Sequence, residues 1–286
     1  MQERKNRDHM TQEERLDYLL TQFKEDSGQY REWETGDDPE EKRMALRSLM
    51  NIRMPRELPE EVLRQQDLFL RQEAMEKGIV ELSDIPTVEE RYGAAGKCGD
   101  RISLWRGDIT RLKVGAIVNA ANSQMLGCFV PCHRCIDNAI HSAAGVQLRA
   151  ECHQLMSHKR MRYGRDYEEP VGQAVLTGGY NLPADRVIHT VGPIVYGELT
   201  ERHCAQLADC YRSCLRLAAG NGLKSIAFCC ISTGEFHFPQ ETAARIAIDT
   251  VTEFLKRDMG LERVVFNVFK EEDLDIYRGL LTGGKR

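Results

Sequence analysis

The stretch "GAIVNAANSQ", residues 115–124, decides the fold class. It begins as an uninterrupted run of small and apolar residues and ends as a polar loop that contains Asn119 and Asn122. A strand that is apolar on both faces is typical of a parallel sheet that is covered by helices on both sides. Ligands of such folds bind outside the carboxyl ends of the strands. We therefore expect this loop to lie at a binding site.

Similar apolar runs recur from about residue 100 onward and alternate with helical patterns. The predicted strands are 101–107, 115–120, 173–179, 186–192, 224–232 and 263–269. The predicted helices are 135–142, 199–222, 239–257 and 270–281. This alternation predicts an α/β fold with three layers, a mostly parallel sheet between two layers of helices.

The first 95 residues have a different, purely helical pattern. Thr11 and Glu14 form a capping-box sequence, Pro39 stands at the start of a second helix, and Pro59 and Gly78 bracket a third. We expect two units, a helical N-terminal segment over 1–95 and an α/β domain over 96–286. Because no catalytic pattern is visible in the segment, we interpret it as an appendage that packs on or covers the domain.

Composition excludes several classes of protein. The chain has 286 residues, ten of them cysteines, and its first thirty residues are charged where a signal peptide is apolar. No run reaches the roughly 18 apolar residues of a membrane span. Residues 1–100 hold 16 basic and 24 acidic side chains, net −8, and the remainder holds 23 and 20, net +3. We expect a soluble cytoplasmic protein that binds neither nucleic acid nor membrane, since it has no dense basic stripe.

Four loops follow the strands in a fixed order: "GDIT" (107–110), "NAAN" (119–122), "IDNAIHSAAG" (136–145) and "ISTGEFHFP" (231–239). Together they resemble the loops of macrodomains, which bind ADP-ribose. The resemblance covers the chain from about residue 100 and implies a three-layer α/β/α macrodomain with a mixed sheet. It implies ADP-ribose contacts by Gly107, Asp108, Ile109, Asn119, Ala120, Asn122, Ser232, Thr233, Gly234, Glu235 and Phe236.

Each of these loops also has a simpler interpretation. Asp108 can accept a hydrogen bond from the adenine amine, or it can merely cap the next turn. The amides of Asn119 and Asn122 can bind ribose hydroxyls, or they can be ordinary turn residues. The loop at 232–236 can turn backbone N–H groups toward a diphosphate, or it can be a plain connection from strand to helix. The resemblance favours the binding interpretation of all three.

The stretch "LGCFVPCHRCIDN", residues 126–138, places three cysteines and a histidine in eight positions. Thiolates and imidazole are preferred zinc ligands, and three of them with one open position make a catalytic site. Adjacent residues of an extended segment point to opposite sides, so Cys132 and His133 are not expected to share a metal. We therefore predict one zinc held by Cys128, His133 and Cys135. A closed four-ligand zinc site, a redox pair of Cys132 with Cys135, and unmetallated packing residues stay open as alternatives.

The resemblance extends to a subgroup of macrodomains, linked to microbial sirtuins, in which such an insertion binds zinc at the catalytic centre. In hydrolytic macrodomains the residue matching Asp137 acts on the distal ribose, and the one matching Asn122 lies beside it. This implies a zinc-dependent hydrolase that removes mono-ADP-ribose from proteins, most readily from Asp or Glu esters. A non-enzymatic ADP-ribose reader and an ADP-ribose-1″-phosphate phosphatase are the alternatives. The implied partners are a sirtuin-type ADP-ribosyltransferase and a lipoyl-carrier protein.

Overall fold

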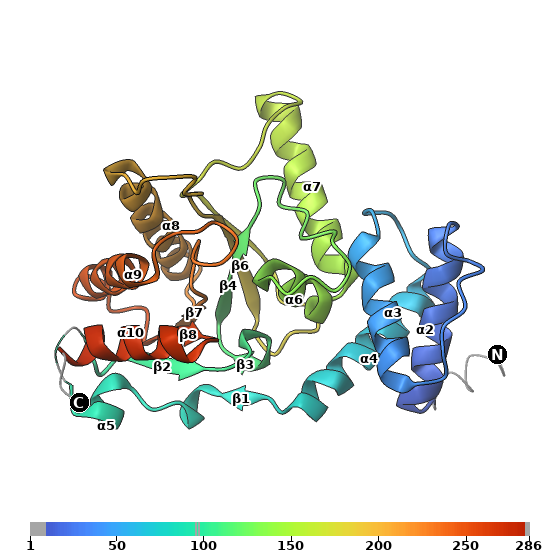
Figure 1. The fold of residues 1–286 in the computed structure, drawn as a ribbon, viewed down its shortest axis with the longest axis horizontal. Coiled ribbons are helices and arrows are strands. Elements are labelled where there is room, and N and C mark those ends of the chain that lie inside the picture. The colour runs from blue at the N-terminus through green and yellow to red at the C-terminus, as the bar shows by residue number, and fades with distance from the viewer. Residues whose placement is uncertain (1–9, 95, 97, 284–286) are drawn as a thin grey trace.

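A six-stranded mixed sheet forms the centre of the α/β domain (Figure 1). The computed structural model describes residues 10–94, 96 and 98–283. All six predicted strands are present, and only β5 is antiparallel to its neighbour. The strands stand in the order β2 (Ile102–Arg106), β8 (Arg263–Val268), β7 (Ser225–Phe228), β4 (Ala116–Ala121), β6 (Arg186–Val191) and β5 (Ala174–Gly178).

Helices cover both faces of the sheet, which confirms the three-layer prediction. On one face lie α8 (Glu201–Gly220), α9 (Gln240–Leu255) and α10 (Glu271–Thr282). Phe228 and Phe266 are partners on neighbouring strands, and their rings pack against Tyr211 of α8 and Tyr277 of α10. The right-handed crossover from β4 to β6 places α6 (Ile136–Ala144) and α7 (Val146–Tyr163) on the opposite face.

Helix α7 is absent from the sequence prediction. Its buried side chains are Leu148, Arg149, Cys152 and Met156. An arginine in the buried stripe interrupts the apolar period from which an amphipathic helix is recognised. In the tertiary structure, backbone carbonyls from other segments accept hydrogen bonds from that arginine. The spacing of apolar residues in the sequence gives no indication of these acceptors.

The N-terminal segment contains the three predicted helices, α2 (Gln12–Ser27), α3 (Pro39–Ile52) and α4 (Glu60–Lys77). Thr11 and Glu14 make the predicted capping box, in which the Thr11 N–H donates to the Glu14 carboxylate at 2.8 Å and the Glu14 N–H donates to Thr11 Oγ1 at 3.2 Å. Leu16, Leu46 and Phe69 belong to a separate apolar core of this bundle. The bundle stands beside α6 and α7 (Figure 1).

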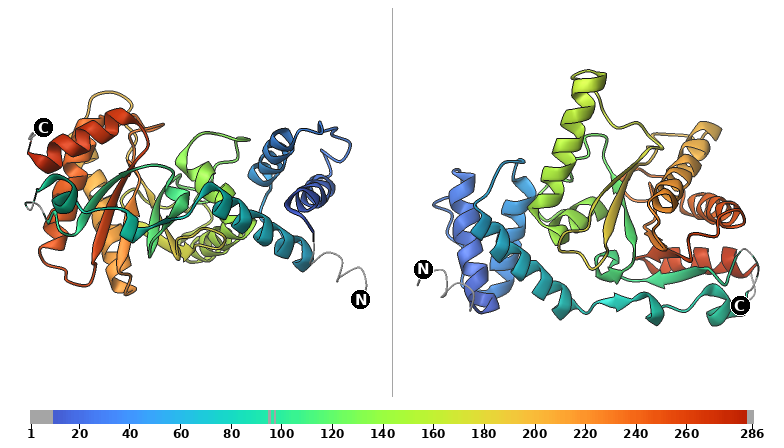
Figure 2. Two further views of the ribbon diagram at one scale, coloured as in Figure 1. Left: turned by 90° about the horizontal axis from the view of Figure 1, so that it is seen from below. Right: turned by 180° about the vertical axis from the view of Figure 1, so that it is seen from behind.

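A strap connects the bundle to the far edge of the sheet. It consists of β1 (Val80–Glu81), which pairs with β3 (Leu112–Lys113), the short helix η1 (Leu82–Asp84) and α5 (Val88–Tyr92). Figure 2 shows the strap running from α4 along the domain to α5. Ile85 and Val88 precede residue 96, yet they are buried in the core of the α/β domain. Within the described residues, no helix combines the length and the apolar character of a membrane span.

Candidate active site

The carboxyl ends of the five parallel strands face one edge of the sheet, and the loops singled out in the sequence emerge there. The first loop is fixed to the end of β8, because the Gly107 N–H donates to the Val268 carbonyl at 3.0 Å and Asn267 Nδ2 donates to the Gly107 carbonyl at 2.9 Å. Asp108 caps η2 (Ile109–Arg111) through Oδ1, which accepts from the N–H of Thr110 at 3.0 Å and from its hydroxyl at 2.7 Å. A carboxylate has two oxygens, so this turn leaves Asp108 able to accept from an adenine amine as well.

The loop after β7 combines buried and exposed positions. Ser232 is buried with a left-handed φ of 64°, and no group in the described part of the chain bonds to its hydroxyl. Thr233 Oγ1 donates to the Cys230 carbonyl at 3.1 Å, and the Val195 N–H donates to the Phe236 carbonyl at 2.9 Å. Gly234 and Glu235 are exposed between these anchors. A buried hydroxyl without a partner costs about 1–3 kcal/mol, which a ligand oxygen beside Ser232 would relieve.

Asp137 is the centre of a buried polar network. Asn119 Nδ2 donates to its Oδ1 at 2.8 Å, and Asn122 Nδ2 donates to its Oδ2 at 3.4 Å and to the Gly127 carbonyl at 3.2 Å. Burial raises the pKa of Asp137 to about 6, whereas the Asn119 hydrogen bond and the positive charge of Arg149 act to lower it. Two amides thus orient the carboxyl, and its raised pKa suits a group that exchanges a proton near neutral pH.

Asn119 has a structural role in this network. Its side chain is fully buried on β4, where the amide also lies 3.0 Å from Nδ1 of His189 on β6. Since the amide already donates, this nitrogen of His189 accepts, and the ring then donates from Nε2 to Thr177 Oγ1 at 2.9 Å. Asn119 therefore positions Asp137 through its amide nitrogen, and its contact with a ribose hydroxyl stays a prediction. Neighbouring Ala120 is only partly buried.

Two neutral imidazoles lie beneath the aspartate. Burial lowers the pKa of His189 to about 3 and lowers that of His141 well below its usual value. His141 Nε2 lies 3.5 Å from Asp137 Oδ1. Gly127 packs directly on the His141 ring, where a Cβ would come within 2.8 Å of a ring atom. His141 thus supports the loop above it through Gly127, and its expected role as a packing residue stays a prediction.

The loop from Leu126 to Cys135, called the metal loop below, brings Cys128, His133 and Cys135 together. One ligand atom from each lies within 4.8 Å of the others, and Cys128 Sγ is 3.7 Å from His133 Nδ1. A tetrahedral zinc with bonds of about 2.3 Å to sulfur and 2.0–2.1 Å to nitrogen requires ligand separations of roughly 3.6 Å. The separation of Cys128 Sγ and His133 Nδ1 matches this value, and the sulfur of Cys135 lies close enough to complete a set of three ligands.

The surroundings of the metal loop suit a catalytic ion. Cys135 caps α6, where its Sγ accepts from the Asn138 N–H at 3.4 Å. Burial raises the pKa of Cys135 to about 12, so a bound cation would be needed to stabilise its thiolate form. Nε2 of His133 faces Glu235 Oε1 at 3.9 Å, which brings the loop after β7 against the metal loop. Asp137 follows Cys135 by two positions.

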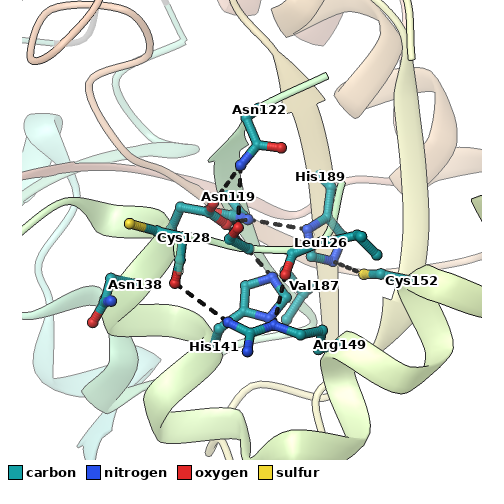
Figure 3. Close-up of polar contacts among 12 residues, drawn as sticks. Asn119, Asn122, Leu126, Cys128, Asn138, His141, Arg149, Cys152, Val187 and His189 are labelled. Carbon is teal, nitrogen blue, oxygen red and sulfur yellow. Dashed lines mark hydrogen bonds and ion pairs between the residues drawn. The ribbon is translucent and has the colours of Figure 1, made fainter. Parts of the chain in front are cut away.

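Arg149 and helix α3 belong to this site, and the sequence pattern missed both. The buried guanidinium of Arg149 donates to the carbonyls of Leu126 and Cys128 in the metal loop at 2.6 and 3.3 Å (Figure 3). Its Nη1 donates to the carbonyls of Met50, Asn51 and Arg53 at the end of α3. The sequence could have indicated this contact through the arginine itself, because an arginine is buried in a protein only where hydrogen-bond acceptors surround it.

Comparison with known proteins agrees with this geometry. A family model described as "Macro domain" matches residues 118–247. A protein-ADP-ribose hydrolase of Treponema medium is 48% identical over 96% of this chain and 100% of its own. A probable bifunctional ADP-ribose hydrolase/ADP-ribosyltransferase of Fusarium oxysporum f. sp. cubense is 43% identical over 82% of this chain and 40% of its own. The Trypanosoma brucei macrodomain in complex with ADP-ribose superposes with a TM-score of 0.60 at 30% identity, over 85% of this chain and 95% of that one. The chain therefore belongs to the macrodomain family.

Proposed function

We propose that this protein is a zinc-dependent hydrolase that removes mono-ADP-ribose from aspartate and glutamate esters of proteins. The similarity to protein-ADP-ribose hydrolases over nearly the whole chain supports the hydrolase class. One observation carries the zinc dependence: the ligand atoms of Cys128, His133 and Cys135 lie within 4.8 Å of one another. The ligand cluster ends two positions before the buried, doubly hydrogen-bonded Asp137.

The nucleotide-binding residues hold the ADP-ribose part of the substrate on loops other than the metal loop. Asp108 accepts from the adenine amine, the buried hydroxyl of Ser232 donates to a phosphate oxygen, and the exposed Gly234 offers its backbone N–H. These contacts fix the distal ribose at the opposite end of the site. Binding energy from the nucleotide thereby positions the scissile bond.

At the distal ribose, Cys128, His133 and Cys135 would hold zinc, which supplies Lewis acidity at the bond to the acceptor oxygen. Asn122 orients a ribose hydroxyl through its amide, which already lies 3.4 Å from Asp137 Oδ2. Water forms the new bond to C1″ of the ribose as the bond to the acceptor oxygen breaks and the carboxylate leaves. Asp137 takes up the proton of this water at Oδ2, the oxygen farther from the buried Asn119. Arg149 maintains the loop geometry through its two carbonyl contacts.

The chemistry of the substrate indicates which class of enzyme must produce it. A mono-ADP-ribosylated protein requires a transferase, and we propose a sirtuin-type ADP-ribosyltransferase that modifies a lipoyl-carrier protein. The relative whose name joins an ADP-ribose hydrolase to an ADP-ribosyltransferase supports a link between the two activities. All ten cysteines are unpaired, which suits a reducing compartment such as the cytoplasm.

The test is release of ADP-ribose from a protein labelled on aspartate or glutamate, with matched arginine-linked and serine-linked substrates. We expect the ester to be cleaved and the other linkages to be cleaved poorly, because their leaving groups are worse than a carboxylate. Retention of the label for hours by a protein that binds ADP-ribose would identify a reader instead. Release of phosphate from ADP-ribose-1″-phosphate with no ester cleavage would identify a phosphatase.

A further inference from the structure

Cys132 is the one cysteine of the metal loop whose thiol points away from the metal ligands, toward helix α3. Its Sγ donates to the Met44 carbonyl at 3.5 Å and lies 3.3 Å from Ser48 Oγ. A thiol has one hydrogen, so the Ser48 hydroxyl donates to the sulfur while the thiol donates to the carbonyl. The Cys132 backbone N–H donates to Asn51 Oδ1 at 2.9 Å. Three groups of one helix therefore hold this residue.

The backbone of Cys132 also has a conformation that needs external support. Its φ is 50°, in the left-handed region that costs a residue with a side chain roughly 1–2 kcal/mol. This turn directs Cys132 outward and the next residue, His133, inward toward Cys128. Asn51 on α3 accepts a hydrogen bond from the Cys132 N–H, and this bond offsets the backbone strain.

Helix α3 is itself fixed against the domain, so it can act as a rigid anchor. Arg47 Nη2 donates to Asn138 Oδ1 at 2.7 Å, and Asn51 Nδ2 donates to Ser142 Oγ at 2.9 Å, both on α6. At the end of α3, the Asn51 carbonyl accepts from Arg149 at 2.7 Å. These contacts hold α3 against both the metal loop and the helix that carries Asp137.

We propose that helix α3 of the N-terminal segment sets the number of zinc ligands by withholding Cys132 through Ser48, Met44 and Asn51. The inference rests on the proposed zinc site. Four nitrogen and sulfur donors lie within eight positions, and zinc readily takes four of them in a closed structural site, where no position remains for a substrate. Ser48 and Asn51 are thus positioning residues that keep the site open.

The experiment counts sulfur atoms around zinc in the full-length protein by X-ray absorption spectroscopy. The wild type should show two sulfur neighbours per zinc. Ser48→Ala combined with Asn51→Ala frees Cys132 and should raise the count to three, slow zinc loss to a chelator, and lower ester hydrolysis by roughly 10- to 100-fold. Adding Cys132→Ala to this pair should restore two sulfur neighbours and most of the turnover.

Control variants separate ligand selection from general loosening of the helix. Arg43→Ala lies on the same helix, and the ion pairs that it removes among the described residues are those to Glu40 and Glu73, so it should keep two sulfur neighbours. Asn51→Asp retains the acceptor for the Cys132 N–H and should also keep two. ADP-ribose affinity and circular dichroism confirm that each variant is folded.

A folded double variant that still shows two sulfur neighbours would overturn the inference, and so would one that loses zinc altogether. Three sulfur neighbours in the wild type would overturn it as well, because Cys132 would then already be a ligand. A wild type that binds no zinc is a separate outcome, which defeats the proposed zinc dependence on which the inference depends.

Discussion

The guanidinium of Arg149 donates a hydrogen bond of 2.7 Å to the backbone carbonyl of Asn51. The two residues come from different units, since Arg149 lies on α7 and Asn51 lies in the last turn of α3. The carbonyls at the end of a helix have no partners within it and carry partial negative charge, so they suit a buried cation. Because the same guanidinium also holds the Leu126 carbonyl at 2.6 Å, one side chain joins the N-terminal helices to the metal loop.

Arg149→Met should destabilise the protein strongly. The substitution leaves buried carbonyls of α3 and of the metal loop without donors, so we expect the free energy of unfolding to fall by about 3–5 kcal/mol. Urea denaturation of the full-length protein measures this. Arg149→Lys retains the charge but not the planar set of donors and should cost less. A midpoint for the methionine variant equal to that of the wild type would contradict the role assigned to this residue.

Zinc should copurify at about one ion per chain, held by Cys128, His133 and Cys135. Alanine at any of the three should lower the metal content measured by elemental analysis, whereas Cys132→Ala should retain it because that thiol bonds to α3. ADP-ribose affinity should change little in the ligand variants, since the nucleotide contacts lie on other loops. Absence of a transition metal from reduced, chelator-free protein would refute the site.

Asp137→Asn should lower turnover while zinc remains bound. The substituted amide keeps the shape of the side chain but cannot take up a proton at Oδ2, so kcat should fall far more than ADP-ribose affinity. The matched control is Asn119→Ala, which leaves the carboxylate in place but removes its 2.8 Å hydrogen bond and should have a smaller effect on kcat. Unchanged ester hydrolysis by Asp137→Asn, with zinc confirmed, would show that this carboxyl is not part of the reaction.

Asp108→Ala should weaken ADP-ribose binding by about 1.5–3 kcal/mol, the scale of a hydrogen bond to a charged group. Because Asp108 also caps η2, Thr110→Val provides the control, as it removes the 2.7 Å hydroxyl contact and keeps the carboxylate. Calorimetric titration with ADP-ribose measures both variants. Equal loss of affinity in the two would assign the effect to the turn and not to adenine recognition.

Deletion of residues 1–78 should give a folded α/β domain with a weakened metal site. The cut keeps Ile85 and Val88 in the domain core, but it removes α3 and the three carbonyls at its end that accept from the buried Arg149. We expect lower thermal stability and altered zinc binding, with ADP-ribose affinity largely retained. A deletion extended through Val88 should be much less soluble. Zinc content and stability identical to those of the full-length protein would show that the bundle is a passive appendage.

Features that depend on local interactions could be predicted from the sequence. The capping box at Thr11, the apolar strand at residues 115–120 and the clustered donors of Cys128, His133 and Cys135 each depend on residues only a few positions apart. Hydrogen bonds at helix ends and the period of apolar residues operate over such distances. The three layers, the edge that carries the loops and the candidate zinc ligands could therefore be predicted from these patterns.

The tertiary structure decided what depends on contacts between distant segments. Cys132 bonds to Asn51 across 81 positions, and Arg149 reaches the same residue across 98. Strand pairing placed Asn119 beside His189, and the fold brought Asp137 within hydrogen-bond distance of the same amide. A buried polar group is stable only when the fold brings it a partner, and a one-dimensional pattern does not reveal which partner that is. The helical segment, which shows no catalytic pattern in its sequence, thus became part of the candidate site through packing alone.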